Sequence, residues 1–288
     1  AFHGVSGGAL SLTGNQYFRQ SAGLPLVGVT HMPFDGYFGE GVDTTAYLER
    51  MLDDPSSGID RPAAVILETV QGEGGLNTAS ADWLRRLQQL CNARDILLIA
   101  DDIQAGCGRT GEFFSFESAG LKPDIVTLSK SLSGYGLPMS VVLIRRDLDV
   151  WRPGQHNGTF RGNNHAFVTA TAALRHYWST PDFAADLAEK SVHLRGRLDR
   201  IVKAFPSDIA EVRGLGMMPG IPFYHAARDE RVTAAAFEEA MIIERSGPHD
   251  EVVKFMMPLT TAKAVLDEGL DIIERAIDKI SRECSEAT

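Results

Sequence analysis

Four short apolar segments constrain the fold of this 288-residue chain more than any other feature. The segments are residues 63–67, 96–100, 125–128 and 141–144. Near-continuous apolar runs of this length are typical of strands that are buried on both faces, as in parallel sheets. A helical pattern at residues 80–91, with Ser80 as its expected N-cap, separates the first two segments. The sequence therefore predicts an α/β fold with a mostly parallel sheet.

The pattern changes near residue 178. Apolar residues recur at helical spacing from Leu187 to Phe205 and again from Leu266 to Ile280. Residues 214–223 indicate a turn and a strand between these helices, and Thr180 fits the N-cap of the first helix, with Pro181 at its first position. We therefore expect a large domain at residues 1–177 and a smaller C-terminal α+β domain at residues 178–288.

Charge and cysteine content narrow the possible partners. The chain has 28 Lys and Arg residues against 38 Asp and Glu residues, a net charge of −10, which argues against nucleic acid as a main partner. No apolar run approaches the roughly 18 residues of a membrane-spanning helix, so no membrane partner is expected. The three cysteines form no pair and the eight histidines show no metal-ligand spacing, so we expect no metal and a reducing, cytoplasmic location.

Two glycine motifs offer competing interpretations. Residues 4–8 match G-x-S-x-G, but that nucleophile motif needs a buried strand directly before it, and only three residues precede it here. Residues 106–111 match the G-x-G-x-x-G motif of nicotinamide-dependent oxidoreductases, but no helical pattern follows to bind a pyrophosphate. Cys107 lies inside this motif, and without a neighbouring His a buried structural cysteine is expected rather than a nucleophile.

Polar residues cluster where the expected strands end. Glu68, Glu73, Asp101, Gln104 and Lys130 all lie at or just beyond these ends, where open α/β sheets bind ligands. A partly desolvated lysine has a lowered pKa and forms Schiff bases, and a carboxylate can hold a cationic ring nitrogen. These are the two requirements of pyridoxal 5'-phosphate, PLP. The alternative is that Asp101 and Lys130 simply pair with each other or reach solvent.

Four ordered segments resemble the class III PLP-dependent aminotransferases. They are residues 68–74, 97–111, 127–138 and 156–164, and residues 2–4 resemble the aromatic-His-Gly turn of the same family. The resemblance implies a PLP-dependent transferase fold of type I. The family's Gly/Ser-rich phosphate-binding loop lies upstream of that turn, so the resemblance also implies that the large domain is incomplete at its N-terminus.

The resemblance assigns roles to the matched positions around the cofactor. Lys130 corresponds to the Schiff-base lysine and proton shuttle, and Asp101 to the residue that holds the pyridinium nitrogen. Gln104 lies near the 3-oxygen of the ring. Phe2 stacks on the ring face, and His3 belongs to the same cofactor-binding turn.

Three more positions follow from the resemblance. Thr159 supplies a hydroxyl to the cofactor phosphate of the neighbouring subunit, which implies at least a homodimer with a shared active site. Glu73 is an acid that pairs with a substrate-binding cation. Lys254 stands where the family usually has the Arg that binds the substrate carboxylate, and it loses the bidentate geometry of Arg. The alternative is that Lys254 is a solvated strand residue.

The implied activity is transfer of an amine from a donor to 2-oxoglutarate, with Lys130, Asp101 and Glu73 as the catalytic residues. Three segments are most similar to members that act on the terminal amine of L-2,4-diaminobutyrate in ectoine biosynthesis, giving aspartate 4-semialdehyde and glutamate. The alternatives are a related aminotransferase for ornithine, 4-aminobutyrate or a siderophore precursor, a nicotinamide-dependent oxidoreductase that uses residues 106–111, and a non-catalytic product.

Overall fold

The computed structural model describes residues 2–225 and 227–286. Its first half contains a four-stranded sheet in the order β1-β2-β3-β4. The strands are β1 Ala64–Leu67, β2 Leu97–Asp101, β3 Ile125–Leu128 and β4 Val141–Ile144. Strands β1, β2 and β3 are parallel, and β4 joins the edge beside β3 in the antiparallel direction. The predicted mostly parallel sheet is therefore confirmed, and each of the four apolar segments forms one strand.

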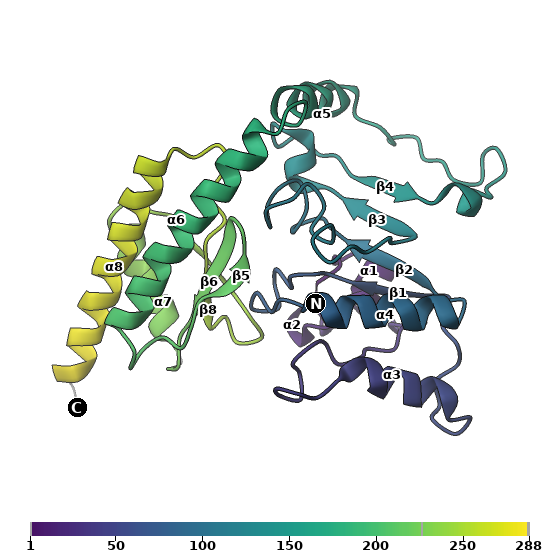
Figure 1. The fold of residues 1–288 in the computed structure, drawn as a ribbon, viewed down its shortest axis with the longest axis horizontal. Helices are drawn as coiled ribbons and strands as arrows, with labels where there is room; N and C mark the ends of the chain where they lie inside the picture. Colours follow the sequence, from purple (N-terminus) through teal and green to yellow (C-terminus); the bar gives the residue numbers. More distant parts are fainter. Residues whose placement is uncertain (1, 226, 287–288) are drawn as a thin grey trace.

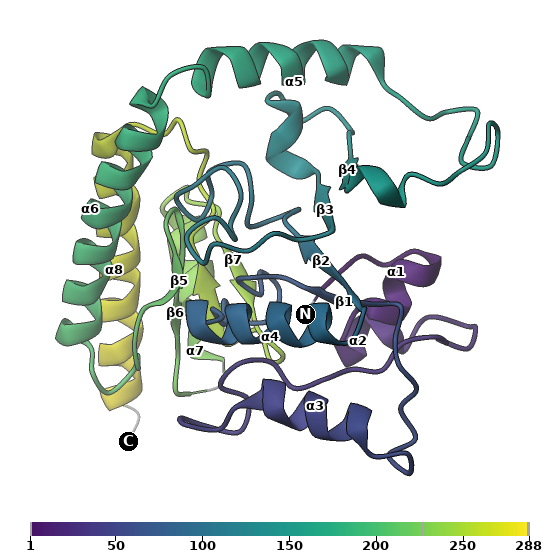
Figure 2. The same ribbon diagram turned by 45° about the vertical axis from the view of Figure 1, so that its right-hand side comes forward.

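Helices cover this sheet. Helix α4, Ala81–Ala93, begins after Ser80, whose side chain accepts a hydrogen bond from the Trp83 N–H as predicted. Its buried leucines pack in one cluster with Leu98 and Val126 of the sheet, and α3, Thr44–Asp53, lies beyond α4 (Figures 1 and 2). The remaining elements of this half are α1 Gly7–Leu12, α2 Gln16–Arg19, η1 Lys130–Ser133, η2 Arg146–Leu148 and α5 Asn164–Tyr177.

The second half contains its own sheet, in the order β5-β6-β8-β7. The elements are α6 Asp182–Ala204, β5 Arg213–Leu215, β6 Met218–Pro222, α7 Arg228–Glu238, β7 Glu244–Ser246, β8 Val252–Lys254 and α8 Lys263–Glu286. Helices α6 and α8 lie side by side on the outside of this sheet (Figures 1 and 2). Leucines and isoleucines of both helices pack with Ile221 and Val253 of the sheet in one buried cluster.

The structure differs from the sequence expectations at three places in this half. Residues 214–223 contain the predicted turn and strand, which is β6, but the turn is preceded by an additional strand, β5, that pairs with β6 as a hairpin. Strand β7 has no counterpart among the sequence expectations, and a strand at β8 was considered only in the alternative for Lys254, because three residues are too few to show an alternating pattern. Pro181 is the N-cap of α6, and the Thr180 hydroxyl bonds to the Asp182 carboxylate at 3.0 Å instead. The domain boundary near residue 178, which falls between α5 and α6, stays a prediction.

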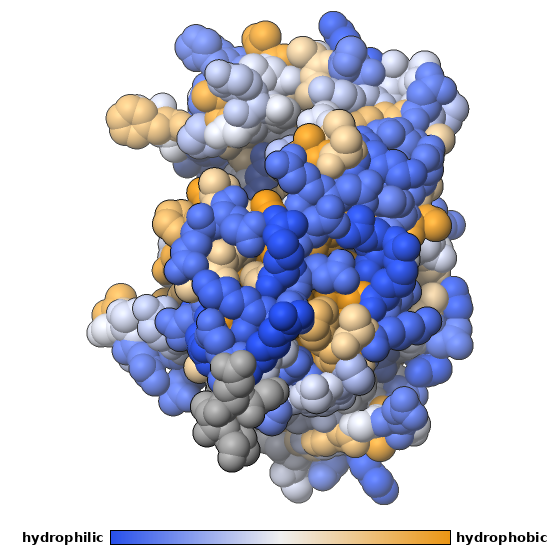
Figure 3. Space-filling view, turned by 90° about the vertical axis from the view of Figure 1, so that its left-hand side faces the viewer, coloured by the Kyte–Doolittle hydropathy of each residue, from blue (hydrophilic) through white to orange (hydrophobic). Residues whose placement is uncertain are grey.

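The outer face of α6 and α8 is mostly hydrophilic (Figure 3). Arg197 of α6 bonds to Asp267 and Asp271 of α8, at 2.7 and 2.5 Å. Among the described residues, no helix is long and apolar enough to cross a membrane. No group of His, Cys, Asp or Glu residues within the same part of the chain is arranged to hold a metal ion.

Leu198 and Val192 provide a matched test of the buried cluster between α6, α8 and the second sheet. Leu198 is fully buried on α6, and Val192 on the same helix is 76% exposed. We expect Leu198→Ala to lower the free energy of unfolding by about 2–5 kcal/mol, because it leaves a cavity. Val192→Ala should change it by less than about 0.5 kcal/mol. Urea denaturation followed by circular dichroism measures both, and equal losses would contradict the assignment of this core.

Candidate functional site

The carboxyl ends of the parallel strands bring polar groups to one edge of the first sheet. Glu68 directly follows β1, Asp101 is the last residue of β2, and Lys130 begins η1 two residues after β3. Asp101 is in register with Thr127 of β3. Lys130 has a φ of 48°, a left-handed backbone conformation that residues other than glycine seldom adopt. Strain of this kind clusters at active sites and ligand clamps.

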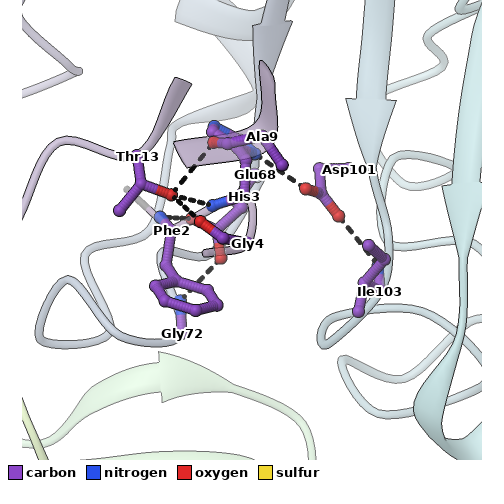
Figure 4. A network of polar contacts seen from close by, with 9 residues as sticks. All are labelled: Phe2, His3, Gly4, Ala9, Thr13, Glu68, Gly72, Asp101 and Ile103. Carbon is purple, nitrogen blue, oxygen red and sulfur yellow. Dashed lines mark hydrogen bonds and ion pairs between the residues drawn. The ribbon is translucent and has the colours of Figure 1, made fainter. Parts of the chain in front are cut away.

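Asp101 is fixed by hydrogen bonds to both carboxylate oxygens (Figure 4). The His3 ring contacts it through Nδ1 at 2.7 Å, and the Ile103 backbone N–H donates to it at 3.1 Å. His3 is held in turn by its own N–H, which donates to the Thr13 hydroxyl at 2.9 Å. The alternative in which Asp101 pairs with Lys130 is therefore wrong, because His3 is the partner.

Glu68 organises the same edge, although the sequence assigned it no role. Its two carboxylate oxygens accept hydrogen bonds from the backbone N–H groups of Phe2, at 2.9 Å, and Gly72, at 3.1 Å (Figure 4). Burial raises the pKa of Glu68, and these two N–H groups only partly oppose that shift. Glu68 therefore holds Phe2 against the start of the 68–78 loop. The signal in the sequence was an acidic residue directly after a buried strand.

Glu73, Gln104 and Lys254 form a hydrogen-bonded group that joins the two sheets. The side chain of Lys254, in β8, is only 1% exposed, and its Nζ donates to Glu73 Oε1 at 2.8 Å. Gln104 Nε2 donates to the same oxygen at 3.0 Å. Burial alone would raise the pKa of Glu73, but bonding to Lys254 and Gln104 outweighs it and lowers the pKa below the usual value. The alternative that Lys254 is a solvated strand residue is therefore wrong.

Two residues outside the predicted set shape this group. A Cβ on Gly72 would lie 1.6 Å from Gln104 Oε1, so the absent side chain leaves room for Gln104. Glu244 is opposite Lys254 in the β7–β8 ladder, and its carboxylate lies 3.6 Å from Lys254 Nζ. The buried ammonium therefore has two acids near it. The pairing of two three-residue strands carries no sequence signal that could have revealed Glu244.

Lys130 lies beside these acidic residues without an ion pair to any described residue. Its side chain is exposed, yet partial desolvation lowers its pKa, and the charges of Glu73, Glu68 and Asp101 only partly oppose this effect. A lowered pKa leaves more of the amine unprotonated at neutral pH. That is the form in which a lysine acts as a nucleophile or a base.

The other predicted positions separate into two groups. Phe2 is tied to the site by its backbone N–H, which donates to Glu68. Its ring packs edge-on against Phe18, with the ring centroids 5.1 Å apart. Thr159 lies in the exposed segment between η2 and α5, and it forms no hydrogen bond with the other predicted site residues among those that the structure describes. The structure thus brings together Phe2, His3, Glu73, Asp101, Gln104, Lys130 and Lys254, and leaves Thr159 apart.

The competing glycine motifs do not form the structures that their chemistry needs. Ser6 precedes the short helix α1 and follows no strand. No helix begins after residues 106–111 to receive a pyrophosphate. Cys107 is buried, and burial raises its thiol pKa to about 11, so it is a poor nucleophile at neutral pH, as expected.

The residues at this edge fit the requirements of a pyridine aldehyde cofactor. Lys130 offers an amine, and Asp101 offers a carboxylate that is already oriented. Gln104 Oε1 and Thr127 Oγ1 are buried and have no hydrogen-bond partner among the described residues. Unpaired buried polar atoms are rare in folded proteins, so their presence here favours a ligand with polar groups.

Comparison with known families identifies the class. Residues 1–277 match the family Aminotransferase class-III, and the chain therefore belongs to that family. It is 56% identical over 280 residues to a diaminobutyrate–2-oxoglutarate transaminase from Vibrio parahaemolyticus, which covers 97% of this chain and 66% of that protein. A protein of the same name from Bordetella parapertussis is 55% identical over 286 residues, covering 98% and 65%. The chain thus spans slightly less than two thirds of the length of these two relatives.

Solved structures agree on the fold. A transaminase from the marine bacterium Virgibacillus has a TM-score of 0.88 at 22% identity, covering 99% of this chain and 67% of that one. An ornithine δ-aminotransferase from Plasmodium falciparum has a TM-score of 0.74 at 30% identity, covering 84% and 61%. The predicted type I fold of PLP-dependent transferases is therefore confirmed.

The Glu73–Lys254 contact gives a pH-dependent prediction. We expect Glu73→Gln to lower the free energy of unfolding at pH 7 by about 2 kcal/mol, because it weakens the bond to a buried ammonium. The pKa of Glu73 is lower in the folded state than its usual 4.5. The stabilisation is therefore present above pH 4.5 and is lost as the pH falls through the folded pKa.

Urea denaturation at several pH values between 7 and 3.5 measures this difference. Glu238→Gln is the matched control, because Glu238 forms an exposed pair with Lys279 and should change stability by less than about 0.5 kcal/mol. A difference between wild type and Glu73→Gln that grew as the pH fell would contradict the prediction.

Proposed function

We propose that this protein is a PLP-dependent aminotransferase that moves the terminal amine of L-2,4-diaminobutyrate to 2-oxoglutarate. The products are aspartate 4-semialdehyde and glutamate. The observation that carries the proposal is the identity of 51–56% to several relatives named diaminobutyrate–2-oxoglutarate transaminase, over nearly the whole of this chain. The strand-end arrangement of Lys130 and Asp101 supports it.

Lys130 and Asp101 would hold the cofactor at the edge of the first sheet. PLP, when bound, supplies an electron sink for the substrate carbon that loses or gains the amino group. Asp101 would hold the cationic ring nitrogen of the cofactor, and its carboxylate is already oriented because His3 and the Ile103 N–H contact its two oxygens. Phe2 offers a flat apolar face, and the backbone bond to Glu68 restrains its position.

Lys130 acts as the base and acid of the reaction. Its Nζ would take a proton from the substrate carbon that carries the amine. It would then deliver a proton to the carbon that receives the amine. The lowered pKa of this amine favours the uncharged form that can accept the proton. Lys130 therefore performs the same step in both halves of the reaction.

Glu73 and Lys254 allow one site to accept two different substrates. Lys254 is paired with Glu73 when no substrate carboxylate is bound to it. When Glu73 turns away, Lys254 Nζ loses the nearer of its two acidic neighbours and can bind a substrate carboxylate through a single point charge. Glu73 is half-buried and accepts both of its bonds on one oxygen, so its displacement breaks only the contacts of Oε1.

We further propose that the active protein is at least a homodimer. Thr159 is exposed and makes no hydrogen bond to the other predicted residues that the structure describes, which fits a hydroxyl that serves the phosphate site of a second subunit. The cytoplasmic location expected from the sequence stays a prediction.

Replacement of Lys130 tests the proposed chemistry. We expect Lys130→Ala to lower kcat by at least about 10²–10⁴-fold, because the proton transfer loses its base. The visible absorbance of cofactor attached to the protein should disappear as well. Lys122→Ala, an exposed lysine before β3, is the control and should keep both properties. Full activity of Lys130→Ala would refute the role of this lysine.

A panel of amine donors tests the substrate. We expect kcat/KM for diaminobutyrate to exceed the values for ornithine and 4-aminobutyrate by at least about tenfold, equivalent to about 1.4 kcal/mol. Steady-state assays with 2-oxoglutarate as acceptor measure these ratios. A preference for ornithine would overturn the donor and favour the function of the structurally similar ornithine δ-aminotransferase, while the transaminase chemistry would stand.

A further inference from the structure

A cavity lies next to Lys130 and shares no other residue with the candidate site described above. Its volume is about 390 Å³, which is in the usual range for small-molecule sites. Its walls come from η1, α5, the start of α6, the 106–113 loop and residues 258–260. None of Phe2, His3, Glu73, Asp101, Gln104 or Lys254 lines it.

Arg109 is the main charged group of this cavity. It is only 6% exposed, and its Nη1 donates to the backbone carbonyls of Met217, at 3.0 Å, and Met257, at 2.7 Å. Its Nε and Nη2 have no hydrogen-bond acceptor among the described residues. Arg109 also forms no ion pair with any acidic residue in that part of the chain. Burial lowers the pKa of Arg109 to about 10, so the guanidinium is still charged at neutral pH.

The charge of the cavity is unusual for this chain. Its lining contains the guanidinium of Arg109 and the amine of Lys130 and no acidic residue, although acidic residues outnumber basic ones by ten in the whole sequence. A buried charge without a counter-ion is costly, and neutral carbonyls do not neutralise it. The cavity therefore lacks the negative group that would balance Arg109.

Aromatic rings form much of the remaining wall. Trp178 packs edge-on against Phe113, at 5.0 Å, and against Phe183, at 5.5 Å, and Tyr177 lies 4.7 Å from Phe183. Such a wall favours binding of a ligand with a flat apolar body, because aromatic rings pack well against flat groups by stacked and edge-to-face contacts. The hydroxyls of Ser131 and Thr260 add polar groups.

We propose that this cavity binds a small organic acid with a flat apolar body, whose carboxylate pairs with Arg109. The guanidinium can still donate from Nε and Nη2, the two nitrogens that form a fork for a carboxylate. This ligand class differs from the aliphatic amino and oxo acids of the proposed reaction, and the proposal does not depend on that reaction.

Calorimetric titration of the purified chain with benzoate and benzamide tests the proposal. The two probes have nearly the same shape, and only benzoate is charged. We expect saturable binding of benzoate, with benzamide at least tenfold weaker. Equal affinity for both probes, or no heat of binding with either, would overturn the proposal.

Two variants of α5 test whether benzoate binds in the cavity or elsewhere on the surface. Leu174 lines the cavity and is 38% exposed, and Val168 on the same helix lies outside the lining and is 69% exposed. We expect Leu174→Glu to weaken benzoate binding at least tenfold, because it places a like charge at the cavity, and Val168→Glu to bind as wild type does. Equal affinities of these two variants for benzoate would also refute the site.

Arg109 itself provides the last comparison. Arg109→Met should abolish benzoate binding, and Arg109→Lys should keep part of it. Because Arg109 also holds two backbone carbonyls, circular dichroism must show that each variant is folded. If Arg109→Met does not fold, the two α5 variants still decide the question. Since these titrations measure no transamination, they succeed or fail separately from the proposed function.

Discussion

Parallel pairing of β1, β2 and β3 is the constraint on which the candidate site depends. Parallel strands end at the same edge of a sheet, so residues that are far apart in the sequence meet there. Glu68 and Lys130 follow β1 and β3, Asp101 ends β2, and the charges of Glu68 and Asp101 act on Lys130. The lowered pKa of Lys130 and the raised pKa of Glu68 both follow from partial removal of water at this edge.

The Glu73–Lys254 bond extends this arrangement to the second sheet. Lys254 is buried in β8, and its acid partner comes from the 68–78 loop of the first half. Ser246 of β7 makes a neighbouring link, because its hydroxyl donates to the Gly72 carbonyl at 2.7 Å and accepts from the Gly75 N–H. The docking of the two sheets and the proposed binding of a substrate carboxylate therefore depend on the same few residues.

The sequence predicted the four strands of the first sheet and helix α4 because their patterns are local and long enough to recognise. Their periodicity, the capping Ser80 and the polar strand ends all lie within short windows. It predicted less of the second sheet, because β7 and β8 have three residues each and gain their stability from pairing. Propensity in such short segments is weaker than tertiary context.

The sequence by itself determined the residue types of the site and their order along the chain. It identified Lys130, Asp101, Glu73 and Lys254, and the aminotransferase resemblance. Only the tertiary structure decided which of them are partners: Asp101 with His3, Glu73 with Gln104 and Lys254, and Glu68 with Phe2. It also revealed Glu244 beside Lys254 and the uncompensated charge of Arg109. The reason is physical, because hydrogen bonding and desolvation depend on distance in space, which residue spacing along the chain does not fix.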